Sequence, residues 1–503
     1  MNFKKTMCLL LVMLSCASAA ACAKQEADSA SQTSAASVSE GETSAPEETG
    51  NGRSEVRDAL PDDLNFNGEA IRVLTRAGDE DTKREFYSEG VDAEVVNDAV
   101  YERNALVQER LNVKLDLILA EDVTRHGDCS GMYRKAISSF SDDFDVISNS
   151  MYYAVAHMME GMFVNLNTIP YIDFTQPWWN QAFLEVTGNN GRNFLAFGEL
   201  SQTMISGTYC MFFNKEMFKE FFQSEPSLYE TVNAGEWTLD KLISYCTPVY
   251  DDLNGNGKAD ASDRYGHFYT NAKTLEADAY VGGCNIELVS RDADGGYIYN
   301  GGGERVADFV SKMKTLLFED NNTCRAPYNN ETVMTTMKDG TTIFTVWMLT
   351  AINYLRDMEA DFGIIPMPKL DENQSGYTAF CHDGSSTFAI PVTIQKNEAA
   401  GAFLEAMSAE TYRRVTPAYF ETAIKNKYSR DSETSQMLDI IVAGVHMDYT
   451  SVFGQNLDAP IDKIRGFFSS KGNCDHAISS LASLEKATLK RMEKIDKLFD
   501  KIS

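Results

Sequence analysis

Residues 68–76 read GEAIRVLTR, a short apolar strand that opens the part of the chain that decides the fold. Residues 96–111 carry their apolar side chains on one helical face, with polar residues opposite. Residues 113–119 alternate apolar and polar side chains, which is typical of a strand. A second helical pattern at 132–140 and the strand FDVIS at 144–148 follow. This order predicts an α/β domain with mostly parallel pairing and right-handed crossovers.

The carboxyl ends of these predicted strands indicate where a ligand would bind. In open α/β sheets, ligands lie beyond the carboxyl ends of the strands. Arg76 ends the first strand, and the segment 148–153, which includes Tyr152, follows the third. We therefore expect Arg76 and this segment near a site.

Length and charge limit the classes of function. The chain has 503 residues and a formal net charge of −29, so it has room for two or more domains. Such a charge argues against nucleic acid and against adsorption to an anionic membrane surface, because no basic patch could offset that field. The sequence contains no HExxH, GxxxxGK[ST], GxSxG or CxxC motif. This argues against zinc hydrolases, P-loop nucleotide hydrolases, serine esterases and dithiol redox proteins.

Residues 1–21 have the pattern of a signal peptide. Two lysines precede an apolar run at 7–14, which is too short to span a bilayer and is followed by small residues. Cys22 follows three alanines and resembles the lipidated first residue of a bacterial lipoprotein, although Ala19 stands where such signals usually carry Leu. Cys16 is a second candidate, and signal cleavage with release of the protein is the alternative.

Residues 22–65 are predicted to form a lipidated N-terminus and a disordered acidic tether. The segment is rich in Ser, Ala, Glu, Thr and Gly, with almost no large apolar residues. It cannot bury enough surface to offset the entropy lost on ordering. About 40 flexible residues span roughly 35 Å, which suits a domain held just off a membrane.

The cysteines beyond the N-terminal segment predict buried thiols. They are widely spaced and odd in number, whereas a disulfide framework would be denser and even. They are Cys129, Cys210, Cys246, Cys284, Cys324, Cys381 and Cys474.

The run DLNGNGKADASDRYG, residues 252–266, has the spacing of a calcium-binding loop. Oxygen-bearing side chains occupy loop positions 1, 3, 5, 9 and 12, which are Asp252, Asn254, Asn256, Asp260 and Asp263. Gly257 at position 6 permits the sharp turn, and Lys258 at position 7 would contribute its carbonyl oxygen. We expect a structural Ca²⁺ here; a glycine-rich surface turn is the alternative.

Four tryptophans are candidates for stacking on a ligand or for packing. Trp178 and Trp179 follow a proline, where paired tryptophans more often pack in a core or interface. Trp237 precedes the predicted helix N-cap Thr238 and completes a hydrophobic staple, which favours a structural role. Trp347 ends a predicted buried strand, where it would face either a cleft or the core.

Several segments together resemble the family 1 extracellular solute-binding proteins of bacterial ABC importers. They include FDVIS, PWWN at 177–180, FFNK at 212–215, GEWTLDKL at 235–242, the acidic loop ending in DRYG, and FGIIPMPK at 362–369. The resemblance covers roughly residues 66–503. One departure is Thr345-Val346-Trp347, where relatives that bind maltose-type sugars usually have Gly-Pro-Trp.

This resemblance implies an α/β fold of the periplasmic-binding-protein type II class, with two α/β lobes joined by hinge crossings and a helical C-terminal region. It implies a first lobe of residues 66–205 and 361–405. The second lobe would comprise residues 206–360 and 406–503.

The resemblance also implies a monomeric, non-enzymatic lipoprotein at the extracellular face of the bacterial cell membrane. It would bind a solute, favoured to be an oligosaccharide, between the lobes and deliver it to the permease subunits of an ABC transporter. The ligand contacts implied in this way are Arg76, Tyr152, Trp178, Trp347 and Tyr377. A secreted glycan-active enzyme and a calcium-stabilised surface adhesin are the alternatives.

Overall fold

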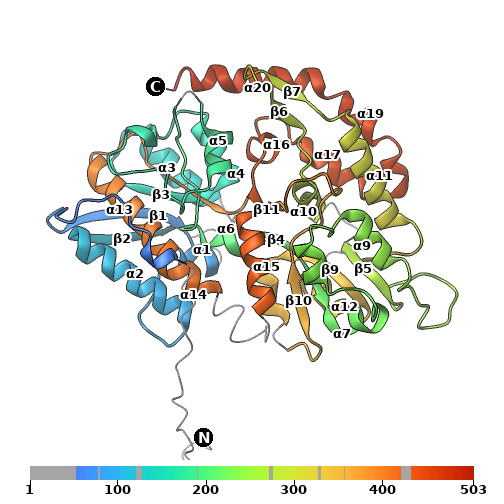
Figure 1. Cartoon of the computed structure of the whole chain (residues 1–503). Helices are drawn as coiled ribbons and strands as arrows, with labels where there is room; N and C mark the ends of the chain where they lie inside the picture. The colour runs from blue at the N-terminus through green and yellow to red at the C-terminus, as the bar shows by residue number, and fades with distance from the viewer. Residues whose placement is uncertain are drawn as a thin grey trace, which may run out of the picture. The chain divides into compact units, whose positions relative to one another are not determined.

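The computed structural model describes residues 52–77, 80–120, 127–189, 191–270, 276–326, 330–355, 357–420 and 432–502. These residues build a four-stranded and a five-stranded sheet, each packed between helices (Figure 1). The predicted signal peptide, Cys22 and the predicted tether up to residue 51 lie outside the described residues.

The described part of the chain contains no helix that is both long and apolar enough to traverse a bilayer.

The first sheet has the strand order β12-β3-β1-β2. β1 (Glu69–Arg76) pairs in parallel with β2 (Val113–Ala120) and β3 (Val146–Ser150), and β12 (Ser386–Ala389) runs antiparallel to β3. One face packs against α2 (Val95–Leu111) and α13 (Asn397–Glu410), and the other against α3 (Gly127–Ser138) and α4 (Met151–Met158). The predicted strand–helix alternation of the α/β fold is therefore confirmed.

The second sheet has the order β10-β4-β9-β5-β8. Its strands are β4 (Tyr209–Asn214), β5 (Tyr265–Thr270), β8 (Thr323–Ala326), β9 (Thr342–Met348) and β10 (Phe362–Ile365). Alternate residues of β4 join different clusters: Phe212 packs in the cluster that contains α12 (Asn330–Lys338), whereas Phe213 packs with α7 (Lys215–Phe221) and α9 (Leu239–Cys246). Since successive side chains of a strand point to opposite faces, α12 covers one face and α7 with α9 the other.

The remaining elements connect or extend these two units. The elements before residue 300 are η1 (Arg53–Glu55), α1 (Glu80–Arg84), η2 (Leu166–Thr168), α5 (Gln181–Thr187), α6 (Gln202–Ser206), α8 (Leu228–Asn233), α10 (Glu276–Gly283), β6 (Val289–Arg291) and β7 (Tyr297–Tyr299). Those from 300 to 420 are α11 (Glu304–Phe318), η3 (Leu349–Leu355), β11 (Ala379–Phe380), η4 (Thr411–Val415) and α14 (Thr416–Phe420). The C-terminal elements are α15 (Ser432–Ala443), β13 (Val445–His446), α16 (Tyr449–Val452), α17 (Pro460–Phe467), α18 (Lys471–Cys474), α19 (Ala477–Ala482) and α20 (Glu485–Phe499).

The lobe boundaries inferred from the resemblance need correction. β10, predicted at 361 to return to the first lobe, instead pairs antiparallel with β4 in the second sheet. The chain rejoins the first sheet with β12, and α13 and α14 then pack with α2, so the first lobe continues to Phe420 (Figure 1). A short apolar strand ended by two prolines fits the edge of either sheet, so local sequence did not decide between them.

The tether prediction is also wrong for residues 53–65, which pack on the first lobe. Leu60 is buried in the core that contains α2 and α13. Asp58 accepts hydrogen bonds from Arg110 at 2.8 Å and from Arg413 at 2.8 Å. Burial alone would raise the pKa of Asp58, but these two arginines outweigh it and lower the pKa to about 2. The partners lie far along the sequence, so the composition of the segment gave no sign of them.

Three local predictions are confirmed. All seven cysteines between residues 129 and 474 are buried thiols. Thr238 caps α9 by accepting the amide of Lys241 at 3.2 Å. Trp237 is buried in the second lobe, where its indole N–H donates to Pro366 O at 2.9 Å.

Candidate functional site

The carboxyl ends of strands from both sheets meet beside two crossing segments, 206–208 and 381–385. In the first sheet, Ser150 at the end of β3 pairs with Ser386. In the second, Met348 at the end of β9 pairs with Tyr209. The crossings touch each other, because His382 N donates to Gly207 O at 3.0 Å. This is where the strand-end rule places a ligand.

Gly207 is required at this contact. A Cβ there would lie 2.5 Å from Thr203 O and 3.2 Å from Ser385 Oγ. The first distance is shorter than real Cβ contacts and lies at the end of α6, so a side chain would distort this turn and would also press on Ser385 of the other crossing. The sequence thus fixes the close approach of the segments that carry the site.

Tyr152 presents an exposed aromatic ring at these strand ends. It lies in the first turn of α4, which follows β3 directly, and is 45% exposed. Its amide donates to Asp383 O at 3.0 Å, and its carbonyl oxygen accepts from Gln455 Nε2 at 2.7 Å. Tyr153 packs edge-on against the ring, with 5.2 Å between centroids. An accessible ring among polar groups is suited to a ligand with an apolar face and hydroxyl groups.

The electrostatics of Tyr152 identify charged groups from the C-terminal helices beside it. Partial burial raises the pKa of its hydroxyl, and the carboxylates of Asp383 and Asp462 add to the rise. Arg465 acts in the opposite direction. Asp462 and Arg465 both lie in α17, so one exposed ring is influenced by groups from two distant parts of the chain.

Arg465 is held by two carboxylates. Its Nε donates to Asp278 Oδ1 at 2.9 Å, and its Nη1 donates to Asp462 Oδ1 at 2.8 Å. Asp278 belongs to α10 and is buried. Burial raises the pKa of Asp278 to about 7; Arg465 opposes the rise, and the carboxylates of Asp383 and Asp462 add to it. This arrangement fixes the guanidinium group and leaves it little capacity to bind an anion.

Comparison with known proteins identifies the architecture. No protein-family model matches the sequence, and no curated protein matches it significantly. The galacto-N-biose/lacto-N-biose I-binding protein of a Bifidobacterium longum ABC transporter, in complex with lacto-N-biose, is similar in structure. The TM-score is 0.55 and the identity 13%, over 85% of this chain and 98% of that one. A sugar transporter from Rhizobium etli in an open conformation has a TM-score of 0.55 and an identity of 13%, over 83% of this chain and 99% of that one. A cyclo/maltodextrin-binding protein complexed with maltotetraose has a TM-score of 0.53 and an identity of 11%, over 87% of this chain and 98% of that one.

The chain has the periplasmic-binding-protein fold. At these identities the likeness establishes the fold alone. The predicted two α/β lobes with a helical C-terminal region are therefore confirmed, and the crossings at 206–208 and 381–385 are connections between the lobes of this fold.

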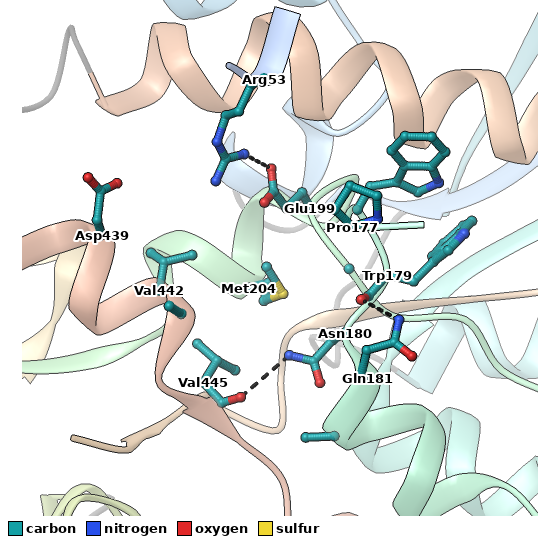
Figure 2. A pocket seen from close by; sticks show the side chains of 14 residues that line it. Arg53, Pro177, Trp179, Asn180, Gln181, Glu199, Met204, Asp439, Val442 and Val445 are labelled. Atoms are coloured by element: carbon teal, nitrogen blue, oxygen red, sulfur yellow. Dashed lines mark hydrogen bonds and ion pairs between the residues drawn. The ribbon is translucent and has the colours of Figure 1, made fainter. Parts of the chain in front are cut away.

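A separate pocket of about 460 Å³ lies where α15 faces the first lobe (Figure 2). Pro177 to Ala182 form one wall, and Asp439, Val442 and Ala443 of α15 form another together with Val445 of β13. Two of its charged groups bind each other, since Arg53 Nη1 donates to Glu199 Oε2 at 2.6 Å. The volume suits a small molecule. None of Tyr152, Asp278, Asp383 and Arg465 lines this pocket, so it is not the strand-end site.

The five residues predicted to bind ligand lie in different environments. Arg76 and Tyr152 are brought to the same crossing, because Arg76 Nη2 donates to Gly384 O at 2.9 Å and to Ser386 Oγ at 2.8 Å. Arg76 is buried and fixes this crossing, whereas Tyr152 is accessible. The ligand-binding role of Tyr152 stays a prediction.

The side chains of the other three predicted residues make contacts within the protein. Trp178 is fully buried in the first lobe, and Trp347 is buried edge-on against Tyr209 with 6.3 Å between centroids. Tyr377 is half-buried, and its hydroxyl donates to Val232 O at 2.9 Å. A ligand-binding role for these three residues stays a prediction, and Trp178 also lines the pocket of Figure 2.

Sequence reasoning missed Asp278, Asp383, Asp462, Arg465 and Gln455. Asp278 could have been found, because it follows the end of β5 and therefore a strand end of the second sheet. The others lie in an irregular crossing and in the helical C-terminal region, where no pattern distinguishes them. Arg465 and Asp278 are 187 positions apart in the sequence.

Proposed function

We propose that this protein is a substrate-binding lipoprotein that captures an oligosaccharide between its lobes and delivers it to an ABC permease. The fold supports the class of protein. The accessible ring of Tyr152, at strand ends beside charged groups from α17, supports the position of the binding site.

The observation that carries the proposal is the setting of Tyr152. Tyr152 belongs to the first lobe, and Gln455, Asp462 and Arg465 approach from the C-terminal helices. A ligand stacked on the ring would contact both lobes only when they are together. Its differential affinity for that arrangement would then shift the population of lobe positions.

A neutral carbohydrate fits the chemistry of this setting. Apolar sugar faces stack on aromatic rings, and carboxylates accept hydrogen bonds from sugar hydroxyl groups. Asp383 and Asp462 would supply such acceptors, while Arg465 is already held by Asp278 and Asp462. Two similar structures contain lacto-N-biose and maltotetraose, which are ligands of those proteins and support carbohydrate as the class to test first.

A thermal-shift screen of residues 52–503 against neutral mono- and oligosaccharides would test the proposal, with calcium held constant. A ligand at one hundred times its dissociation constant should add about 2.7 kcal/mol to the free energy of unfolding. Calorimetry on the best ligand would then compare Tyr152→Ala with Tyr101→Ala, whose tyrosine is exposed on α2 away from the crossings.

We expect Tyr152→Ala to weaken binding roughly tenfold, since stacking on one ring contributes about 1 kcal/mol or more. Tyr101→Ala should bind as the wild type does. No thermal shift with any sugar of the panel, or equal affinity of the wild type and the two variants, would contradict the proposed carbohydrate site.

One observation favours the alternative of a glycan-active enzyme. A carboxyl group with a pKa near 7 beside other carboxylates resembles the acid of a glycosidase, and Asp278 has this property. However, Asp278 is buried and bound to Arg465, so it does not reach a glycosidic oxygen. Incubation of the protein with its best ligand should therefore release no product, and hydrolysis lost in Asp278→Asn would establish the enzyme instead.

The proposed location follows from the N-terminal sequence. Cys22 would carry the lipid and hold the folded part at the extracellular face of the membrane, where a monomer could meet its permease. An adhesin held by the same anchor is the remaining alternative. It would show no change in lobe separation by small-angle scattering when sugars are added.

A further inference from the structure

The loop between α9 and β5, residues 252–263, is held by hydrogen bonds among its own polar groups. The carboxylate of Asp252 accepts the amides of Gly255 at 2.8 Å and Gly257 at 2.7 Å. The side-chain amides of Asn254 and Asn256 both donate to the carboxylate of Asp260, at 3.2 and 2.7 Å. Loop positions 3 and 5 therefore meet at position 9, while position 1 binds the backbone amides of positions 4 and 6.

Asp263, at loop position 12, supplies an independent sign of a missing partner. The residue is only 1% exposed, and its Oδ1 atom is buried with no hydrogen-bond partner. Its other oxygen, Oδ2, accepts the amide of Asp260 at 2.9 Å, so the carboxylate faces the loop. A buried carboxylate oxygen without a partner is costly, and a cation is the partner that would satisfy it.

The donor atoms select the kind of cation. Within the described ranges, no three or more His, Cys, Asp or Glu side chains are grouped so as to hold a metal by themselves. The carboxylates of Asp252, Asp260 and Asp263 therefore do not lie close enough together to hold a metal by themselves, and a cation in this loop would have to draw them together, with amide and carbonyl oxygens as further ligands. Ca²⁺ accepts six to eight such oxygens in flexible geometry, whereas Mg²⁺ requires a near-ideal octahedron and retains water.

We propose that residues 252–263 bind one structural Ca²⁺. The ligands are side-chain oxygens of Asp252, Asn254, Asn256, Asp260 and Asp263, with the carbonyl oxygen of Lys258. The cation takes the place of the amide donors now facing Asp260, so that the oxygens of Asn254 and Asn256 turn inward.

The position of the loop indicates what the ion stabilises. Asp251 and Arg264 close its base through two backbone hydrogen bonds, and the hydroxyl of Tyr265 donates to Asp260 O at 2.8 Å. Tyr265 begins β5, a strand with neighbours on both sides in the second sheet. The loop therefore leads into the amino end of β5, whereas the strand-end site lies at carboxyl ends. The ion secures the second lobe and does not contact the solute.

The test uses residues 52–503 freed of metal with a chelator, and Tb³⁺ as a luminescent substitute for Ca²⁺. Tyr250 and Tyr265 flank the loop, since their hydroxyls contact Asp263 and Asp260, and they sensitise Tb³⁺ luminescence. We expect luminescence that Ca²⁺ displaces. We also expect a rise in melting temperature of at least about 2 °C in Ca²⁺ that equal Mg²⁺ does not produce.

Asp263→Asn and Asp260→Asn should weaken Ca²⁺ binding by at least about tenfold, because the charge of the ligands sets the affinity of such loops. The matched control is Asp292→Asn in the β6–β7 turn, where the carboxylate likewise accepts backbone amides, from Asp294 at 3.0 Å and Gly296 at 2.7 Å. This control removes one charge from an acidic turn and should leave Ca²⁺ affinity unchanged.

Three results would overturn the proposal. The first is a wild-type melting temperature that does not change with Ca²⁺, and the second is an equal rise of the melting temperature in Mg²⁺. The third is wild-type Ca²⁺ affinity in a correctly folded Asp263→Asn or Asp260→Asn variant. Near-ultraviolet circular dichroism establishes the folding of each variant before titration. Sugar affinity is measured separately at saturating Ca²⁺, so failure of the carbohydrate proposal leaves this test intact.

Discussion

Glu405 provides a stability prediction that can be worked out from its surroundings. It lies in α13 and is 1% exposed. Its Oε2 accepts the indole N–H of Trp179 and the amide of Asp173, both at 3.3 Å. Burial raises the pKa of Glu405 to about 8, and these hydrogen bonds oppose the rise without cancelling it. The folded protein therefore holds Glu405 protonated at neutral pH.

The sign of the effect on stability follows from proton linkage. Because the folded-state pKa exceeds the ordinary value of 4.5, the folded state binds this proton more tightly than the unfolded state. The stabilisation is complete below pH 4.5 and is lost as the pH rises toward 8. At about 1.4 kcal/mol per pH unit, the interval corresponds to at most about 5 kcal/mol. We expect roughly 2–3 kcal/mol after relaxation around the charged group.

Glu405→Gln keeps the shape of the protonated acid and removes its ionisation. At pH 8.5, above the pKa of Glu405, the variant should be more stable than the wild type by roughly 2–3 kcal/mol. At pH 5 the two proteins should differ by less than about 1 kcal/mol. Urea unfolding at both pH values, with calcium constant, measures the two differences.

Glu398→Gln is the matched control, because Glu398 is exposed at the start of the same helix. We expect it to change neither stability nor pH dependence by more than about 0.5 kcal/mol. An unchanged pH dependence in Glu405→Gln, or a loss of stability at pH 8.5, would mean that folding does not raise the pKa of Glu405. The argument from burial would then be refuted.

Two further predictions concern contacts that join distant parts of the chain, and a third concerns the N-terminal anchor. Asp58→Ala removes the carboxylate shared by two arginines and should lower the free energy of unfolding at pH 7 by roughly 2–3 kcal/mol, measured in urea. Asp496→Ala removes an acceptor for Asn189 at 3.0 Å in the first lobe and for Tyr297 at 2.8 Å in the second. It should widen the distribution of lobe separations in small-angle scattering; an unchanged profile would contradict this. Cys22→Ala should move the protein from the membrane fraction to the medium, and retention in the membrane would show that Cys22 is not the anchor.

Local patterns in the sequence predicted local structure well. The alternation at 113–119 became β2, and the apolar stripe at 96–111 became α2, because one face of each is buried in the core of the first lobe. Thr238 caps α9 as expected, since an N-cap depends only on residues within one helical turn. In each case the interactions that determine the structure lie close together in the sequence.

Contacts between distant residues were not predictable in this way. β10 looks like any short edge strand, and its partner β4 is fixed only by the assembled second sheet. The segment 53–65 has the composition of a tether, yet Asp58 binds two arginines that lie far apart in the sequence of the first lobe. The influence of Asp383 and Arg465 on Tyr152 likewise depends on the assembled fold and could not be predicted from local sequence.

The contacts around Tyr152 also bear on how much a ligand must contribute to closure. The side-chain amide of Gln455 already donates to the carbonyl oxygen of Tyr152 at 2.7 Å, and α20 connects the two lobes through Asp496. Moving a two-state equilibrium from 1:99 to 99:1 requires about a 10⁴-fold difference in affinity between the states. Contacts within the protein that favour the joined arrangement reduce the share that the ligand must supply. A ligand of moderate affinity is therefore sufficient if it stacks on Tyr152 and hydrogen-bonds to Asp462 across the same gap.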